Sequence, residues 1–137
     1  MKTTNNANIY FDFNFIKDNE IGSYLKNSEA IIVPYNKKSS LNSGTLWMCM
    51  SYSKTMILPL IGCVKDIENY DKFLYVYDYD KEEEHYNALL KCLKGIKQDI
   101  TKDEDILSKK GKSAYEFIIK NQTWEILKEK WIELYKF

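Results

Sequence analysis

Apolar runs separated by polar, helix-like segments organise the first 80 residues of the chain. Ala30–Pro34 and Thr55–Leu60 are almost wholly apolar, which is typical of strands covered on both faces of a parallel sheet. Ile9–Phe13 and Phe73–Tyr77 are rich in aromatic and β-branched residues and indicate two further strands. Four strands alternating with helices predict an α/β fold, a Rossmann-like doubly wound parallel sheet of about four strands, because parallel strands need crossover connections.

Helical segments join these strands and continue to the end of the chain. The predicted helices are Asp18–Asn27 with Asp18 as N-cap, Thr45–Tyr52, a short turn at Lys65–Tyr70, and a helical C-terminal segment over residues 81–137. Within that segment we expect a stripe of Tyr86, Leu89, Leu90, Leu93 and Ile96, a helix at about Asp103–Ile119, and a last helix capped by Thr123 with Trp124, Leu127, Trp131 and Leu134 as its inner face. The whole chain, 1–137, forms one domain, and its polar head Met1–Asn8 is expected to be mobile.

The segment from Ala30 to Val64 carries the clearest functional signal. A strand leads through the loop Asn42-Ser43-Gly44 into an apolar helix. This geometry directs unpaired backbone N–H groups and the positive end of the helix dipole at the space above the sheet. The sequence therefore predicts an anion site, suited to phosphate, at this corner.

Composition narrows the possible partners. The 20 basic residues balance 20 acidic ones and all of the basic residues are lysine, so an arginine clamp on phosphate is excluded and a nucleic-acid partner is not expected. Cys49, Cys63 and Cys92 lie in apolar contexts without metal-ligand spacing, which favours reduced, buried thiols in a cytoplasmic protein. The polar N-terminus indicates no signal peptide, and the longest apolar run, Met56–Val64, is too short to span a bilayer.

Side-chain catalysis finds little support. His85 is the single histidine, follows three glutamates and is expected at the surface. No Ser-His-Asp arrangement or metal set can be built from it. A response-regulator receiver needs an acidic cluster after its first strand, whereas Asp12 has no acidic neighbour.

Three segments carry a family resemblance. NIYFDFNFIKDNEIGSYLKNSEAIIVPY, SGTLWMCMSYSKTMILPLIGCVKDI and NQTWEILKEKWIELY resemble, in order, the C-terminal half of family-4 glycosyltransferases, which have the GT-B fold. That family transfers a sugar from a nucleotide-sugar to an acceptor with retention of anomeric configuration, usually without a bound metal. Its C-terminal domain holds the nucleotide diphosphate.

The resemblance implies positions for the donor. Ser43, Gly44, Thr45 and Lys38 are expected at the diphosphate, and Phe15, Ile16, Tyr35 and Met48 at the nucleoside. Catalysis would rest on electrostatic stabilisation of the leaving diphosphate. We therefore expect no catalytic side chain, no metal and no cofactor, with the nucleotide-sugar as substrate.

The chain also departs from the family pattern. The family often carries two glutamates, the second of which grips the donor ribose, and these positions are Ser40 and Met48 here. The family's Gly-Lys-Pro turn reads Ser53-Lys54-Thr55. Two βα units and an N-terminal domain that precede the first strand in the family have no counterpart, so the expected fold is incomplete relative to a full GT-B C-terminal domain. Either Ile9–Phe13 pairs directly with Ala30–Pro34, or another copy of the chain completes the sheet.

Two functional hypotheses follow. In the first, the chain is the donor-binding part of a retaining glycosyltransferase of capsular or exopolysaccharide biosynthesis, cytoplasmic or peripheral at the inner membrane face, and inactive when isolated. In the second, it is a non-catalytic truncated module that self-associates or docks onto a separate N-terminal partner. The expected partner is the missing N-terminal domain or another copy of the chain in a homo-oligomer, and neither nucleic acid nor an integral membrane segment is expected.

Overall fold

A three-stranded parallel sheet lies at the centre of the molecule. The computed structural model describes residues 2–3, 8–38 and 40–136. The strands β3 (Ala30–Ile32), β4 (Thr55–Pro59) and β5 (Tyr75–Tyr77) lie side by side in that order. The registers are parallel, with Ile31 opposite Met56 and Leu58 opposite Val76. The predicted mixed α/β architecture is thus confirmed, with three parallel strands where about four were expected.

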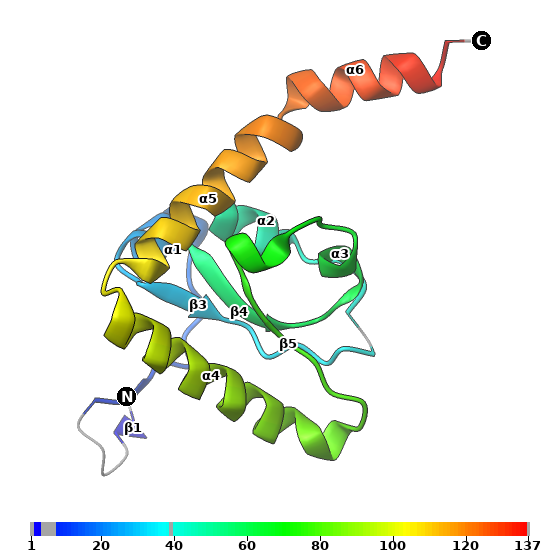
Figure 1. Cartoon of the computed structure of the whole chain (residues 1–137). Helices are drawn as coiled ribbons and strands as arrows, with labels where there is room; N and C mark the ends of the chain where they lie inside the picture. Colours follow the sequence, from blue (N-terminus) through cyan, green and yellow to red (C-terminus); the bar gives the residue numbers. More distant parts are fainter. Residues whose placement is uncertain (1, 4–7, 39, 137) are drawn as a thin grey trace.

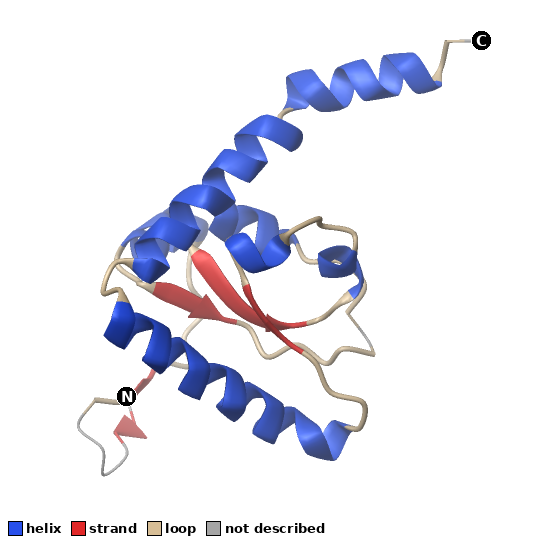
Figure 2. Ribbon diagram, in the orientation of Figure 1, coloured by secondary structure: helices blue, strands red, loops and turns tan. Residues whose placement is uncertain are grey.

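Helices cover both faces of this sheet (Figures 1 and 2). One face carries α2 (Gly44–Ser51) and α5 (Ile106–Asn121), with α1 (Asp18–Lys26) and the short α3 (Gly62–Lys65) beside them. The other face is covered by α4 (His85–Lys102). Two single 3₁₀ turns, η1 (Tyr70–Lys72) and η2 (Glu82–Glu84), flank β5.

Side-chain alternation along β4 divides the core into two clusters. Met56 and Leu58 point to the face of α2 and α5, in the larger cluster, whereas Ile57 points to α4 and joins a smaller cluster. All five residues of β4 are buried. A central strand that is covered on both faces needs apolar side chains at every position, which explains the uninterrupted apolar run in the sequence.

The first predicted strand does not join this sheet. β2 (Tyr10–Phe11) pairs antiparallel with β1 (Lys2–Thr3) in a separate two-stranded ribbon, so the predicted pairing of Ile9–Phe13 with Ala30–Pro34 is wrong. The Asp12 carboxylate accepts hydrogen bonds from the backbone N–H and the side-chain amide of Asn14, at 3.0 and 2.7 Å, and this turn bends the chain directly after β2. Of the head predicted to be mobile, residues 1 and 4–7 lie outside the described residues.

The last helix also differs from its prediction. α6 (Trp124–Leu134) extends away from the body of the molecule (Figure 1). None of its residues is buried, and Trp124 is 83% exposed. The face expected to point inward is therefore largely in solvent. Tyr86, the first residue of the predicted stripe on α4, is exposed as well. Within the described part of the chain, no helix combines the length and the apolar character that crossing a membrane requires.

Candidate functional site

The N-terminus of α2 forms the corner that the sequence singled out. Ser43 is the N-cap residue, with an extended backbone and a side-chain oxygen that accepts the Leu46 N–H at 3.0 Å. Its own N–H donates to the Asn42 Oδ1 at 2.8 Å. Ser43 is only 4% exposed. These contacts make Ser43 a buried cap that starts the helix directly after the loop from β3.

Two backbone N–H groups of this corner stay available. Gly44 and Thr45 are the first two residues of α2, and such N–H groups have no acceptor within the helix. Among the described residues, no loop or side chain accepts from either one. Apart from its chain neighbours and the helix backbone, a β-carbon on Gly44 would meet nothing within 4 Å. Gly44 is exposed, and no side chain of the described residues lies over its β position.

Tyr35 lies at this corner, away from the other residues predicted at the nucleoside. Its hydroxyl lies 2.8 Å from the Ser43 Oγ. Tyr35 follows β3 by three residues, so the loop must fold back over the carboxyl end of the sheet to make this contact. The sequence offered no sign of this pairing, because the two residues are eight positions apart in a loop without periodicity.

A second set of contacts fixes the same loop to the end of β5. The Lys37 N–H donates to the Tyr79 hydroxyl at 2.9 Å, and the Lys37 ammonium donates to the Tyr79 carbonyl at 2.6 Å and forms an ion pair with Asp78. The hydrogen bond from Lys37 lowers the pKa of Asp78, and the same bond raises the pKa of Lys37. We call this set of contacts of Lys37 with Asp78 and Tyr79 the loop clasp.

Lys38 contrasts with its neighbour. Its side chain is exposed and has no hydrogen-bond or ion-pair partner in the described part of the chain, while its N–H donates to the Asn36 Oδ1 at 2.9 Å. Because Lys37 is held by the clasp, Lys38 is the lysine of this loop whose ammonium is left for an external anion.

The remaining predicted nucleoside residues separate into two groups. Ile16 and Met48 line one apolar pocket of about 400 Å³, together with Ile21, Tyr24, Leu25, Ser28 and Ile31. Phe15 is 87% exposed and is not part of this lining. The Ser28 hydroxyl, which donates to the Tyr24 carbonyl, is the one side-chain polar group of this lining other than the tyrosine hydroxyl. The structure thus brings Ile16 and Met48 together but places Phe15 and Tyr35 elsewhere.

His85 is not the surface residue expected from its acidic surroundings. Its ring is half-buried and stacks on Tyr79 with centroids 4.5 Å apart, and its Nε2 lies 2.8 Å from the Tyr77 hydroxyl. Burial raises the pKa of Tyr77 to about 12, so this phenol stays protonated. His85, the first residue of α4, is half-buried because it packs against Tyr77 and Tyr79. From the sequence alone, the three glutamates before it predict an exposed side chain.

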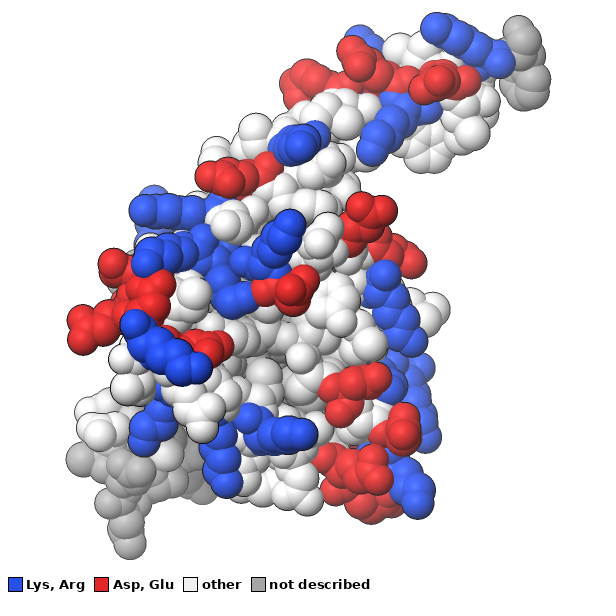
Figure 3. All heavy atoms as spheres, in the orientation of Figure 1, with Lys and Arg blue, Asp and Glu red and all other residues white. Residues whose placement is uncertain are grey.

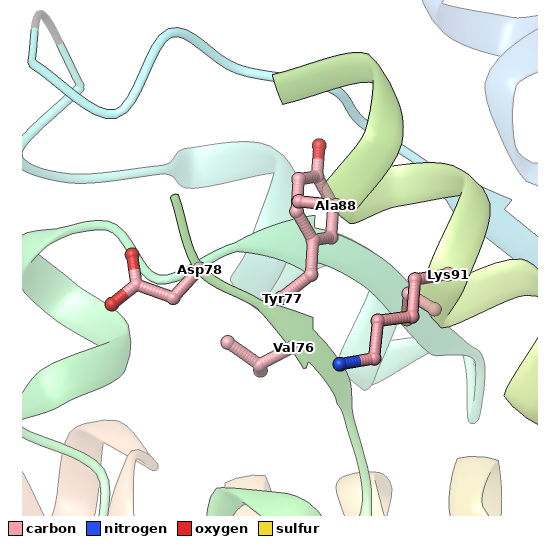
Figure 4. A pocket seen from close by; sticks show the side chains of 6 residues that line it. Val76, Tyr77, Asp78, Ala88 and Lys91 are labelled. Atoms are coloured by element: carbon pink, nitrogen blue, oxygen red, sulfur yellow. The ribbon is translucent and has the colours of Figure 1, made fainter. Parts of the chain in front are cut away.

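A shallow pocket lies next to this aromatic stack, between β5 and α4 (Figure 4). It has a volume of about 370 Å³ and is lined by Val76, Tyr77, Asp78, Ala88, Lys91 and Cys92. Asp78 and Lys91 lie on opposite sides of it, and the Asp78 carboxylate is engaged by the clasp. The pocket therefore offers one uncommitted cation, on Lys91, and mostly apolar walls.

The three cysteine thiols are partly or fully buried. Burial raises the pKa of Cys49 to about 11 and also raises the pKa values of Cys63 and Cys92, which makes all three poor nucleophiles at neutral pH. In the described ranges, no group of three or more histidine, cysteine and carboxylate side chains is placed to hold a metal ion. Acidic and basic side chains are interspersed on the face shown in Figure 3.

Comparison with known proteins assigns the chain to no family. No model of a protein family, no curated protein and no solved structure matches this chain. The candidate site therefore stands on its geometry: a helix N-terminus with two available amides, a free lysine in the preceding loop and an apolar pocket along the same helix.

Proposed function

We propose that this chain binds the diphosphate of a nucleotide-sugar at the N-terminus of α2, as the donor-binding part of a retaining glycosyltransferase. The observation that carries the proposal is the open corner at Gly44 and Thr45, where two N–H groups without acceptors among the described residues meet the positive end of an eight-residue helix. Lys38 supplies a positive charge from the loop before it.

The expected strength of binding follows from these groups. Hydrogen bonds to charged groups contribute about 1.5–3 kcal/mol each, and the helix dipole adds roughly 0.3–1 kcal/mol near its end. Two such bonds and the dipole sum to about 3–7 kcal/mol, which corresponds to a dissociation constant on the order of 0.01–4 mM for a diphosphate. An isolated nucleoside diphosphate is thus expected to bind weakly but measurably.

The backbone at Ser53 supports the family resemblance. This residue stands where the family has the glycine of a Gly-Lys-Pro turn, and its φ is +57°. Left-handed backbone is the conformation that favours glycine. A glycine at this position would adopt the same backbone without strain, which fits the resemblance, and the turn leads into β4.

The chemistry assigned to the site is electrostatic. Amides fixed at the leaving diphosphate stabilise the charge that develops as the sugar departs. The chain's own groups then need neither a nucleophile nor a metal ligand. We place the reaction in the assembly of a capsular or exopolysaccharide, on the cytoplasmic side of the membrane, as part of the same proposal.

Titration of the full chain with UDP and with GDP, measured by isothermal calorimetry, tests this proposal. Replacing Gly44 by leucine should weaken the binding of the better nucleotide at least tenfold, because the side chain would cover the first amides. Gly95→Leu on α4 is the matched control, since a β-carbon there also meets nothing within 4 Å, and it should leave binding unchanged. Absence of binding of both nucleotides at a concentration tenfold above the weakest expected constant, roughly 40 mM, would refute the proposal.

A non-catalytic module that self-associates is the second candidate. The exposed apolar side chains at the two ends of the described chain, such as Phe13, Phe15, Trp124 and Leu134, favour it. Size-exclusion chromatography with light scattering separates the candidates when combined with the titration. A stable oligomer without nucleotide binding supports the module, whereas nucleotide binding supports the donor site.

A further inference from the structure

The hydrogen bonds of Ser43 leave this residue without a group to offer a ligand. Its hydroxyl oxygen accepts from the Leu46 N–H and is linked to the Tyr35 hydroxyl, and its N–H is taken by Asn42. Its side chain is buried. Ser43 was expected to contact the diphosphate, but its contacts point inward and hold the first turn of α2.

We propose that Tyr35 is a positioning residue for the donor diphosphate. Its hydroxyl, 2.8 Å from the Ser43 Oγ, fixes the cap so that the N–H groups of Gly44 and Thr45 face the ligand. This inference rests on the proposed function. A helix end that keeps its cap frays less, so its free amides stay in one arrangement and lose less entropy on binding.

Tyr35 is itself held by Tyr79, which follows β5 at the opposite edge of the sheet. The Tyr79 hydroxyl lies 3.4 Å from the Tyr35 carbonyl and accepts the Lys37 N–H at 2.9 Å. Tyr79 is buried and stacks on His85. The chain is therefore anchored on both sides of Asn36 by one hydroxyl group. This arrangement connects the end of β5 to the start of α2 through two tyrosines.

The variant Tyr35→Phe removes the link and keeps the ring, which packs against the larger core cluster. We expect UDP to bind roughly 3–10-fold more weakly, the effect of one lost neutral hydrogen bond. Binding of uridine, which has no phosphate, should not change. The Leu46 amide, which donates to the Ser43 Oγ, should exchange its hydrogen faster in the free protein, because the cap is less firmly held.

Tyr52→Phe is the matched control. Tyr52 follows the other end of the same helix, and its hydroxyl forms no hydrogen bond within the described residues. Calorimetry with UDP, an NMR titration with uridine and hydrogen exchange of the Leu46 amide would be measured on the full chain for both variants. The control should match the unmodified protein in all three.

The outcomes separate the two proposals. If the unmodified chain binds neither UDP nor GDP, the proposed function fails. Hydrogen exchange then still tests the link, because unchanged protection of the Leu46 amide in Tyr35→Phe overturns the role of Tyr35. If the chain binds UDP and both variants bind it equally, the donor site stands and the inference about Tyr35 is wrong. An equal loss for UDP and uridine would also overturn it, because a merely structural defect does not distinguish a ligand by its phosphates.

Discussion

The consecutive helices α5 and α6 both carry apolar faces, yet only α5 packs against the body of the protein. Gly111 and Ala114 of α5 are buried, and Phe117 stacks on Phe73 of the core with ring centroids 5.0 Å apart. In α6 no residue is buried, and Trp131 is 56% exposed. An apolar stripe at helical spacing was therefore not enough to predict burial.

The difference lies in the small residues of α5. A β-carbon at Gly111 would lie 2.0 Å from the Ser53 carbonyl oxygen, so the helix lies against the backbone of the turn before β4. Ala114, about one turn later on the same helix, is fully buried. The apolar face of α6 consists of large side chains such as Trp124, Trp131 and Leu134. Small residues fit α5 to a particular surface of this chain, and α6 has no such fit.

Gly111→Ala should have the largest effect on this comparison. The added methyl group collides with backbone, which cannot move as a flexible side chain would, so we expect a loss of about 2–4 kcal/mol in the free energy of unfolding. Gly95→Ala on α4 is the control, because its β-carbon would meet nothing within 4 Å. It should stabilise the protein by roughly 0.5–1 kcal/mol through helix propensity. Urea unfolding measures both, and equal effects would show that Gly111 is not in close contact.

The second prediction compares one aromatic residue from each helix. Phe117→Ala should destabilise the protein by about 2–3 kcal/mol, somewhat less than a fully buried phenylalanine, because its ring is only partly buried. Trp131→Ala should change the free energy of unfolding by less than about 0.5 kcal/mol. Thermal and urea unfolding at low protein concentration measure the pair. A loss above 1 kcal/mol for Trp131→Ala would mean that α6 has a partner in solution.

Sequence patterns predicted those elements whose burial depends on neighbours nearby in the chain. β4 and α2 begin within one residue of the predicted positions. The uninterrupted apolar run predicts the strand, and Ser43 before the apolar segment predicts the start of the helix. The failures concern partners distant in sequence. Nothing in Ile9–Phe13 specified which strand it pairs with, and nothing in Glu82–Glu84 indicated that His85 would stack on Tyr79.

The candidate site shows the same division. The strand, turn and helix pattern correctly predicted the start of α2 to within one residue, and a β-carbon on Gly44 would meet nothing within 4 Å. That Gly44 and Thr45 hold an anion stays a prediction. The contact between Tyr35 and Ser43 and the clasp of Lys37 depend on how a loop without periodicity folds over the sheet. Hydrogen bonds of this kind are set by tertiary structure, so no local pattern predicts them.

Ser53→Gly tests the turn whose backbone lies against Gly111 of α5. It should change the free energy of unfolding less than Gly111→Ala or Phe117→Ala. The φ of Ser53 is +57°, a backbone that costs a residue with a side chain roughly 1 kcal/mol relative to glycine. We expect a stabilisation of about 0.5–1 kcal/mol, measured by urea unfolding. Asn69 has a φ of +55°, and asparagine tolerates this region better. Asn69→Gly should therefore stabilise the protein less, and the reverse order would contradict this account of the turn.

The smallest effect on stability is expected at the loop clasp, because the charged side chains of Lys37 and Asp78 are partly exposed. The pKa of Asp78 is lowered by the hydrogen bond from Lys37, so the ion pair stabilises the fold above the ordinary aspartate pKa of 3.8 and loses this effect as the pH falls through the lowered value. The pKa of Lys37 is raised, so the effect persists up to its ordinary value of 10.5 and is lost above it.

Asp78→Asn should consequently lower the urea midpoint slightly between about pH 5 and 9, and the difference from the unmodified protein should disappear in acid. Glu116→Gln on α5 is the control, because Glu116 forms no ion pair among the described residues. A difference for Asp78→Asn that persists unchanged in acid would show that a neutral contact holds the loop instead. In that case the hydrogen bond between the Lys37 N–H and the Tyr79 hydroxyl, which involves neither charged group of the ion pair, would be the contact that fixes the loop before α2.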